Sequence, residues 1–407
     1  MLTRRGRLVL VLALALYLAA WAFGSSSLYP VAVGLLLAVG LAWVWVRLAN
    51  RPVRLRRSTW GGEHVEGDDV AVTLELEQEG RAIPAGQTMV ERLERLGEFT
   101  VPLRRSGRRL SARYVIPGVP RGRYRFTSSV LTTEDAFGLA RTESVQPATG
   151  ALLLLPRLAH LDNLFSEVGA YAQDGRRLLL RRPSGFDLHS VREYERGESL
   201  RKVHWPTTAR RGKLMVKELE DAPRDEVAVL LDAHAGGVAG EPPDSSFDTS
   251  VRAAGSILAA HARRGRTAVL VVNGRTRETA GVRGDGADFR GALELLAAAE
   301  PAGRSPASAL LAEDASAAAR ALELTVVTSQ LTPGLVERLV QRSLARRGVS
   351  LVYVDASSFA SGEGTVREPA LLRLQSAGVP VAVLRRGDDL AAALGAAGLQ
   401  GAARVSA

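Results

Sequence analysis

The chain opens with two apolar runs, Leu8 to Phe23 and Val31 to Val46, of sixteen residues each. As a helix, each run would span about 24 Å at ~1.5 Å per residue, against a bilayer hydrocarbon core of ~30 Å. Leu28 and Leu48 can extend the second run to a full crossing. The pattern therefore predicts a hairpin of two transmembrane helices within residues 1–50.

Between residues 51 and 156 the hydrophobic period changes to two, as in half-buried strands. The segments Val70 to Glu77, Leu110 to Ile116 and Tyr124 to Thr132 alternate apolar and polar positions, with turn signals between them. Short strands at this spacing predict a small antiparallel sandwich. We also expect a turn at Asp135–Leu139 that buries Phe137.

From residue 226 to residue 407 buried apolar strands alternate with helical segments. Val227–Leu231 is a continuous apolar strand, Val349–Val354 is a further strand, and Phe247–Arg264 has helical spacing. This alternation predicts an α/β domain, doubly wound around a mostly parallel sheet. Ligands of such sheets bind at the carboxyl ends of the strands, which here end near Asp232, Asn273, Thr328 and Asp355.

The charge distribution argues for a membrane surface and against nucleic acid. The net charge is +10, but the first 57 residues contain eight arginines and no acid, so the remainder is close to neutral. Anionic lipid is the natural partner of such flanks, and a globally basic surface, typical of nucleic-acid binders, is missing. Arginines flank both outer ends of the hairpin, which places the termini and the soluble domains in the cytoplasm, on the inner side of the cell membrane.

The sequence contains no recognisable catalytic motif. It has no cysteine, which excludes thiolate nucleophiles and disulfides. It also lacks a phosphate-binding Gly-x-x-x-x-Gly-Lys-Ser/Thr loop and a His-Glu-x-x-His pair. No carboxylate or hydroxyl follows Asp232 closely enough to complete a hard-cation site, so we interpret it as a helix-capping strand end. We expect no metal, no cofactor and no enzymatic activity. The alternative is an enzyme or binding protein for an anionic substrate at the carboxyl ends of the sheet.

The segment 157–225 is predicted to be a connector, and its basic part, Gly185 to Lys217, contains all three lysines of the chain. It allows three interpretations: a site for an acidic partner, a solvated linker, or a clasp in which Trp205 fills the seam between domains. We favour the clasp. The candidate binding residues are Arg192, Tyr194, Gly197, Glu198, Arg201, His204, Trp205, Arg210, Lys213 and Lys217.

The motif Arg-x-Tyr-x-x-Gly-Glu-x-x-Arg-x-x-x-Trp, from Arg192 to Trp205, followed by a strand ending in an aspartate, resembles the domain-of-unknown-function family 58. The resemblance implies a membrane protein with a von Willebrand factor A-like domain over residues 226–407. It also implies a protein partner, often a MoxR-type AAA+ ATPase. One departure concerns the Asp-x-Ser-x-Ser metal motif of von Willebrand factor A domains, which here reads Asp232-Ala-His-Ala-Gly236. We therefore expect a membrane-anchored scaffold or adaptor that binds proteins.

Overall fold

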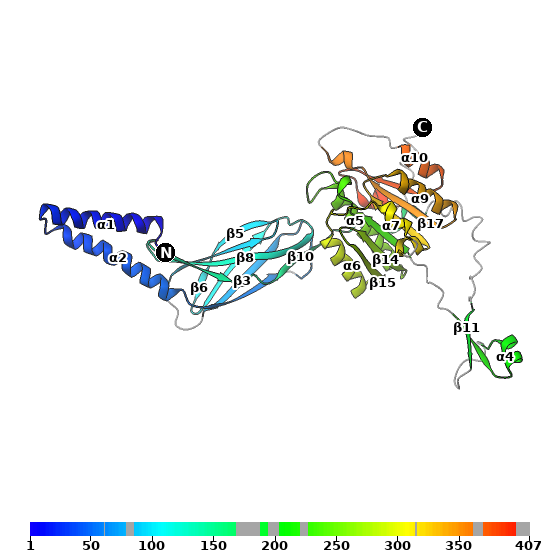
Figure 1. The fold of residues 1–407 in the computed structure, drawn as a ribbon, viewed down its shortest axis with the longest axis horizontal. Helices are drawn as coiled ribbons and strands as arrows, with labels where there is room; N and C mark the ends of the chain where they lie inside the picture. The colour runs from blue at the N-terminus through cyan, green and yellow to red at the C-terminus, as the bar shows by residue number, and fades with distance from the viewer. Residues whose placement is uncertain are drawn as a thin grey trace. The chain divides into compact units, whose positions relative to one another are not determined.

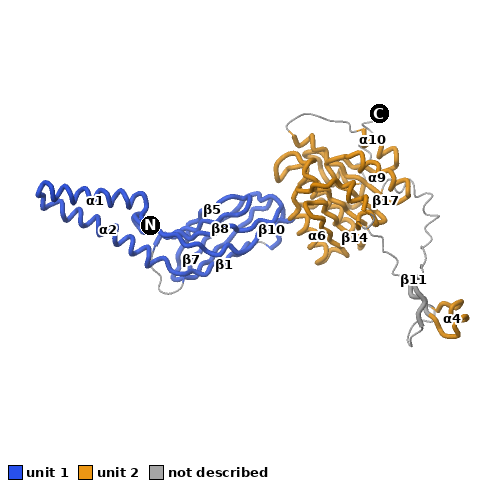
Figure 2. Tube along the Cα trace, in the orientation of Figure 1, with its two compact units in different colours: residues 1–155 blue, residues 156–407 orange. Residues whose placement is uncertain are grey.

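The computed structural model describes residues 1–60, 62–78, 85–167, 188–193, 203–219, 227–313, 316–360 and 369–395. The chain divides into two compact units, residues 1–155 and residues 156–407 (Figure 2). Each unit has its own core, so each is considered by itself.

The first unit begins with the helical hairpin of α1 (Arg4–Phe23) and α2 (Leu28–Ala49), which lie side by side (Figure 1). Thr3 caps α1 by accepting a hydrogen bond from the Gly6 N–H, and Gly24 ends it in the left-handed region at φ 67°. Both helices are long and apolar enough to cross a membrane. The two predicted apolar helices are thus present. Helix α1 begins four residues before the first apolar run, and α2 extends three residues beyond each end of the second run.

The rest of the first unit consists of two sheets that share one apolar core. The first sheet has the order β1-β3-β7-β6, and the second has the order β2-β10-β8-β4-β5, with β9 paired to β8. The predicted strands correspond to β3, β7 and β8, in which every second side chain faces the core. The strand bounds are β1 Val53–Trp60, β2 His64–Val65, β3 Val70–Gln78, β4 Gly86–Leu93, β5 Gly97–Pro102, β6 Arg104–Ser106, β7 Arg109–Ile116, β8 Gly122–Glu134, β9 Arg141–Gln146 and β10 Ala151–Leu155.

A buried ion pair connects strands of the two sheets. Arg57 Nε of β1 lies 2.5 Å from Glu91 Oε1 of β4, and both side chains are almost fully buried. The Tyr114 hydroxyl donates to Glu91 Oε2 at 2.7 Å, and Ser129 Oγ donates to Oε1 at 3.3 Å. Burial, and then the neighbouring Glu91 carboxylate, raise the pKa of Tyr114, so its hydroxyl stays protonated and available as a donor. The carboxylate therefore has partners on both oxygens.

The turn after β8 forms as predicted, but the expected burial of Phe137 is wrong. Asp135 accepts hydrogen bonds from the N–H groups of Phe137 and Ala140, at 2.8 and 2.6 Å. Phe137 is nevertheless 78% exposed, because Leu139 and Ala140 are the residues of this turn that pack against α2. The apolar residue that the turn buries is therefore Leu139.

The second unit is built around a six-stranded sheet with the order β15-β14-β13-β16-β17-β18. All neighbouring strands are parallel except β15, which is antiparallel to β14. The mostly parallel sheet was predicted, whereas the edge strand β15 was not. The bounds are β13 Val227–Asp232, β14 Thr267–Asn273, β15 Arg277–Arg283, β16 Glu323–Thr328, β17 Gly348–Val354 and β18 Val381–Leu384.

Helices cover both faces of this sheet. On one face, α5 (Ser246–Arg263) packs against β13 and contacts α6 (Ala287–Ala298) and α11 (Leu390–Leu394). On the other face, a second core joins the sheet to α7 (Ala307–Ala312), α8 (Ala317–Arg320), α9 (Pro333–Leu344) and α10 (Pro369–Ser376). The chain proceeds from β13 to β14 in one direction and then returns across β13 to β16. The gap between the ends of β13 and β16 is therefore a topological switch point.

Part of the predicted connector belongs to the second unit. Ala159 N–H donates to Ser256 Oγ of α5 at 2.9 Å, and Arg263 donates to the Leu161 carbonyl at 3.0 Å. Leu164 and Phe165 are fully buried. Residues 157–167 are thus docked on the domain rather than being a free linker.

Further along the connector, β11 (Leu188–Glu193) pairs antiparallel with β12 (Met215–Leu219), and α4 (Trp205–Arg211) lies between them in the sequence. The helix begins at Trp205, with Pro206 in its first turn. Proline is well tolerated in the first turn, because the N–H that it lacks has no intrahelical acceptor at that position. Arg192 lies in β11.

Candidate functional site

The structure brings three polar side chains together at the switch point of the α/β sheet. Asp232 ends β13, Asn273 ends β14 and Thr328 ends β16. Asn273 Nδ2 donates to Asp232 Oδ1 at 3.2 Å, and Thr328 Oγ1 donates to Asp232 Oδ2 at 2.9 Å. The sequence placed these residues near a common edge, and the sheet order makes them direct neighbours.

Burial dominates the electrostatics of this cluster. Asp232 is only 7% exposed, and its desolvation raises the pKa of the carboxyl group. The hydrogen bonds from Thr328 and Asn273 oppose that rise, because they favour the charged form. The His234 N–H adds a third donor, at 3.3 Å from Oδ1.

The surrounding loops are held tightly by backbone contacts. Gly303 donates its N–H to the Ala233 carbonyl at 2.8 Å and accepts the Ala235 N–H at 3.1 Å. A Cβ at Gly303 would lie 2.6 Å from the Asn273 carbonyl oxygen, so only glycine fits there. The Ser305 carbonyl accepts a second hydrogen bond from Asn273 at 2.8 Å. Gly303 and Ser305 could not be predicted from the sequence, because neither ends a strand and neither belongs to a recognisable motif.

The hydrogen-bond donors of this cluster bind the Asp232 carboxyl group, and the described residues around it form no metal site. No group of three or more His, Cys, Asp or Glu side chains suited to a metal ion occurs among the described residues. Both Asp232 oxygens already accept hydrogen bonds from protein groups. Asp355, at the end of β17, makes its contacts elsewhere, with Ser357 at 2.6 Å and Arg385 at 3.6 Å. Since Asp232 is the ionisable group at the centre of the cluster, an anionic substrate would meet a carboxyl group rather than a cation.

The second candidate site is the α4 segment, residues 203–215. Val203 and Met215 are buried, and the His204 N–H donates to the Met215 carbonyl at 2.8 Å. The Met215 N–H in turn donates to Thr208 Oγ1 at 3.0 Å. These bonds fix the short helix against β12, so that α4 stands on a small folded base.

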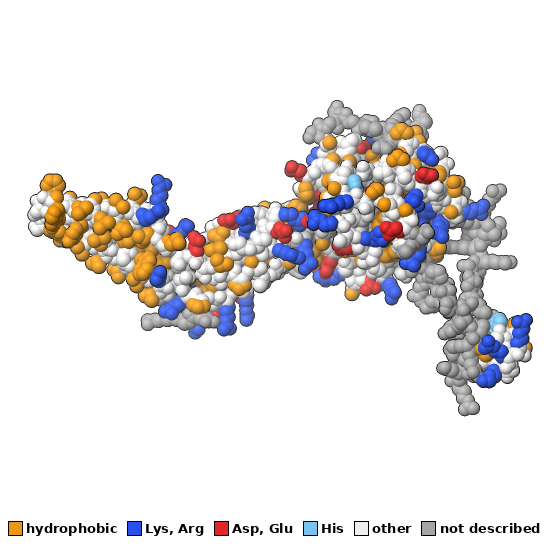
Figure 3. All heavy atoms as spheres, viewed as in Figure 1, with side chains coloured by type: hydrophobic (Ala, Val, Ile, Leu, Met, Phe, Trp, Pro, Cys, Tyr) orange, Lys and Arg blue, Asp and Glu red, His pale blue; other side chains and the backbone are white. Residues whose placement is uncertain are grey.

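The α4 segment exposes an aromatic side chain and several cationic ones. Trp205 is 64% exposed, and Arg210, Arg211 and Lys213 are exposed as well. Figure 3 shows blue Lys and Arg side chains over the surface of this segment. Trp205 is exposed among the residues that the structure describes, and the seam-filling clasp stays a prediction. This exposure agrees with the docking alternative, because tryptophan is a residue type that dominates interface energetics.

The other predicted binding residues are placed only in part. Tyr194, Gly197, Glu198 and Arg201 lie outside the described residues. Arg192 pairs with Val216, and Lys217 pairs with Val191, in the β11–β12 ladder. The part of the motif that the structure describes is thus a two-stranded ribbon that carries α4.

Residues 190–357 match the family model described as "Protein of unknown function DUF58". The resemblance inferred from the Arg192–Trp205 motif is thereby confirmed over this range. A similar protein is the "Uncharacterized protein YeaD" of Bacillus subtilis (strain 168), which is 25% identical over 236 residues. The match covers 56% of this chain and 56% of that relative, so the chain spans little more than half of the relative's length.

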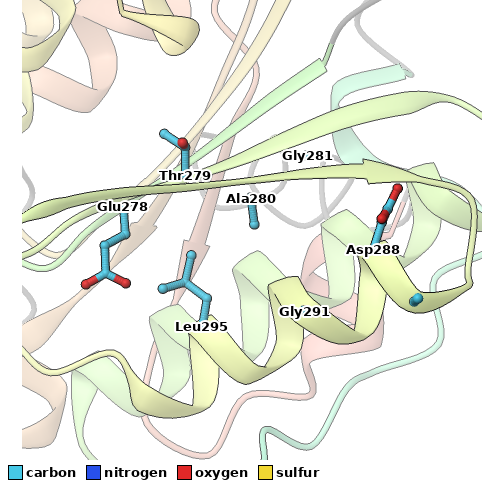
Figure 4. A pocket seen from close by; sticks show the side chains of 8 residues that line it. Glu278, Thr279, Ala280, Gly281, Asp288, Gly291 and Leu295 are labelled. Carbon is cyan, nitrogen blue, oxygen red and sulfur yellow. The ribbon is translucent and has the colours of Figure 1, made fainter.

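The DUF58 match includes both the α4 segment and the Asp232 cluster. It also includes a shallow groove of about 520 Å³ between β15 and α6 (Figure 4). Glu278 and Asp288 lie at opposite ends of this groove, and Ala280, Gly281 and Gly291 line its middle. The two carboxylates lie apart with small residues between them, so they do not point at a common substrate atom. The groove therefore shows no arrangement of catalytic side chains.

Proposed function

We propose that this protein is a membrane-anchored, cytoplasm-facing adaptor that docks an acidic protein partner through the α4 segment. The hairpin α1–α2 serves as the anchor, and the second unit is a von Willebrand factor A-like domain that acts by binding rather than by catalysis. The partner implied by the resemblance to the DUF58 family is a MoxR-type AAA+ ATPase.

The observation that carries this proposal is that Trp205, Arg210 and Lys213 are all exposed on the short α4 segment. An exposed tryptophan and exposed cations on one segment match the composition of interface hot spots, in which tryptophan and arginine are enriched. The cations complement an acidic surface and increase the association rate. The Asp232 cluster agrees with a binding role, because protein groups already donate hydrogen bonds to both of its carboxyl oxygens and no metal-binding group of side chains occurs among the described residues.

The test uses the full chain in nanodiscs and a MoxR-type ATPase of the same host as the probe, with affinity measured by biolayer interferometry. Trp205→Ala should weaken binding by at least ~2 kcal/mol, the hot-spot threshold. Its stability should stay within about 0.5 kcal/mol of the wild type, as for surface substitutions. Leu344→Ala is the matched control, because Leu344 of α9 is also an exposed apolar side chain of the second unit.

Two results would contradict the proposal. If Trp205→Ala binds as tightly as the wild type, α4 is not the docking surface. If Trp205→Ala instead destabilises the protein by about 3–5 kcal/mol, the range for large-to-small aromatic changes in cores, Trp205 is a buried clasp and not a docking residue. Charge-neutral variants at Arg210 and Lys213 should lower the association rate and its salt dependence, with a smaller effect on dissociation.

A further inference from the structure

The turn Asp135–Leu139 of the sandwich is fastened to the first turn of α1. Thr3 N–H donates to the Leu139 carbonyl at 3.0 Å, and Thr3 Oγ1 donates to the Gly138 carbonyl at 2.6 Å. A Cβ on Gly6 would lie 2.0 Å from the Leu139 carbonyl oxygen, so the helix and the turn are in direct backbone contact. The turn therefore keeps a fixed height along the hairpin.

Along the hairpin axis, the turn lies beside the apolar part of α2. Leu139 and Ala140 share one apolar cluster with Val39, Ala42 and Val46 of α2. Since α2 ends at Ala49, Val39 and Ala42 stand about 15 and 10 Å above its end, at ~1.5 Å per residue. The turn thus lies beside helical turns that a membrane-spanning helix places in or near the hydrocarbon.

The same level carries the features of a membrane interface. Arg47 of α2 lies over the ring of Trp43, with Cζ 4.2 Å from its centroid. Arg4, Arg5 and Arg7 occupy the first turn of α1. Tryptophan and arginine gather where head groups meet hydrocarbon, and Figure 3 shows the apolar surface of the hairpin ending at a group of blue cationic side chains.

Phe137 is the aromatic side chain that the sandwich exposes at this level, and it is 78% exposed. The other large apolar side chains exposed on the described part of the sandwich are Val115 and Val145. Val115 pairs with Ala71 in β3, seven residues from Gln78, which donates to the Ala49 carbonyl at 2.9 Å. At ~3.3 Å per strand residue, Val115 lies about 23 Å along the strand from the hairpin end.

We propose that the turn Asp135–Leu139 is a third membrane contact, in which the Phe137 ring inserts into the lipid leaflet beside the arginine-rich ends of α1 and α2. The insertion holds the sandwich upright on the bilayer and adds to the anchoring by the hairpin. This inference rests on the proposed membrane anchor. It commits to lipid as the occupant, because Leu139 and Ala140 at the end of the turn pack in one buried cluster with the apolar residues of the membrane-crossing helix α2.

The test exploits the absence of cysteine from the chain. Single variants Phe137→Cys, Val115→Cys and Leu12→Cys of the full chain are labelled with a nitroxide and reconstituted in vesicles of phosphatidylcholine and phosphatidylglycerol. Collision rates with oxygen, which partitions into lipid, and with a water-soluble nickel chelate report the depth of each label. All three native side chains are exposed in the protein, so the labels leave the packing intact.

We expect the label at position 137 to collide with the nickel chelate several-fold less often than the label at position 115, and to approach the lipid-like behaviour of position 12 in the middle of α1. If position 137 behaves like position 115 while position 12 reports lipid, the insertion of Phe137 is refuted and the anchor stands. If position 12 also reports water, the anchor fails, and the insertion fails with it.

Discussion

Lowering the pH should destabilise the second unit through one buried side chain, His261 of α5. This histidine is 3% exposed, and its Nδ1 atom is buried without a hydrogen-bond partner. Burial, followed by the nearby charges of Arg266 and Arg264, lowers the pKa of His261 to about 3. In the unfolded chain the ordinary value is about 6.5, so the unfolded state binds the proton more tightly.

The sign and size of the effect follow from this difference. Above pH 6.5 the imidazole is neutral in both states and adds no pH dependence. Below pH 6.5 only the unfolded state takes up the proton, and the free energy of unfolding falls by up to about 1.4 kcal/mol per pH unit. Between pH 8 and pH 5 the loss should reach about 2 kcal/mol. Asp232 contributes with the opposite sign, because its raised pKa favours the folded state as the pH falls.

The comparison of wild type with His261→Leu isolates the histidine term from that of Asp232. The free energy of unfolding of the second unit, residues 156–407, is measured by urea titration at pH 8 and at pH 5, with circular dichroism as the signal. The wild type should lose about 2 kcal/mol more than His261→Leu. His160→Leu is the control, because His160 is exposed and its replacement should change stability by no more than about 0.5 kcal/mol. Equal pH dependence in wild type and His261→Leu would refute the reasoning.

Three further predictions concern the fold, the topology and the metal chemistry. Glu91→Ala should lower the free energy of unfolding by about 3–5 kcal/mol, because it leaves Arg57 buried without its carboxylate partner. The control Glu143→Ala, which breaks an exposed ion pair, should lower it by no more than about 1 kcal/mol. Equal losses in the two variants would contradict this prediction. Reporter fusions at Ser26 and after residue 395 should give opposite signals if both ends of the hairpin face the cytoplasm, and the prediction is wrong if the signals agree. Calorimetry with Mg²⁺ or Mn²⁺ should show no site tighter than about millimolar, and a micromolar site lost in Asp232→Ala would overturn the expectation of metal independence.

Local periodicity explains why much of the fold could be predicted. The two apolar runs predict α1 and α2, because a helix that long and apolar has few alternatives. Alternation in Val70–Glu77 predicts β3, because neighbouring side chains of a strand face opposite sides. β15 escaped prediction because it is a solvent-facing edge strand, in which Val282 alone is fully buried. Backbone pairing with β14 makes this segment a strand, although its own side chains show no strand-like alternation.

The site depended on contacts that no local pattern contains. The sequence by itself determined that Asp232, Asn273 and Thr328 end buried strands, and that Trp205 lies among cations. Only the tertiary structure decided that β14 and β16 flank β13, which brings the three polar side chains within hydrogen-bonding distance. It also decided that Trp205 and Phe137 are exposed, since an aromatic residue is buried or exposed according to what packs above it, and those neighbours come from distant parts of the chain.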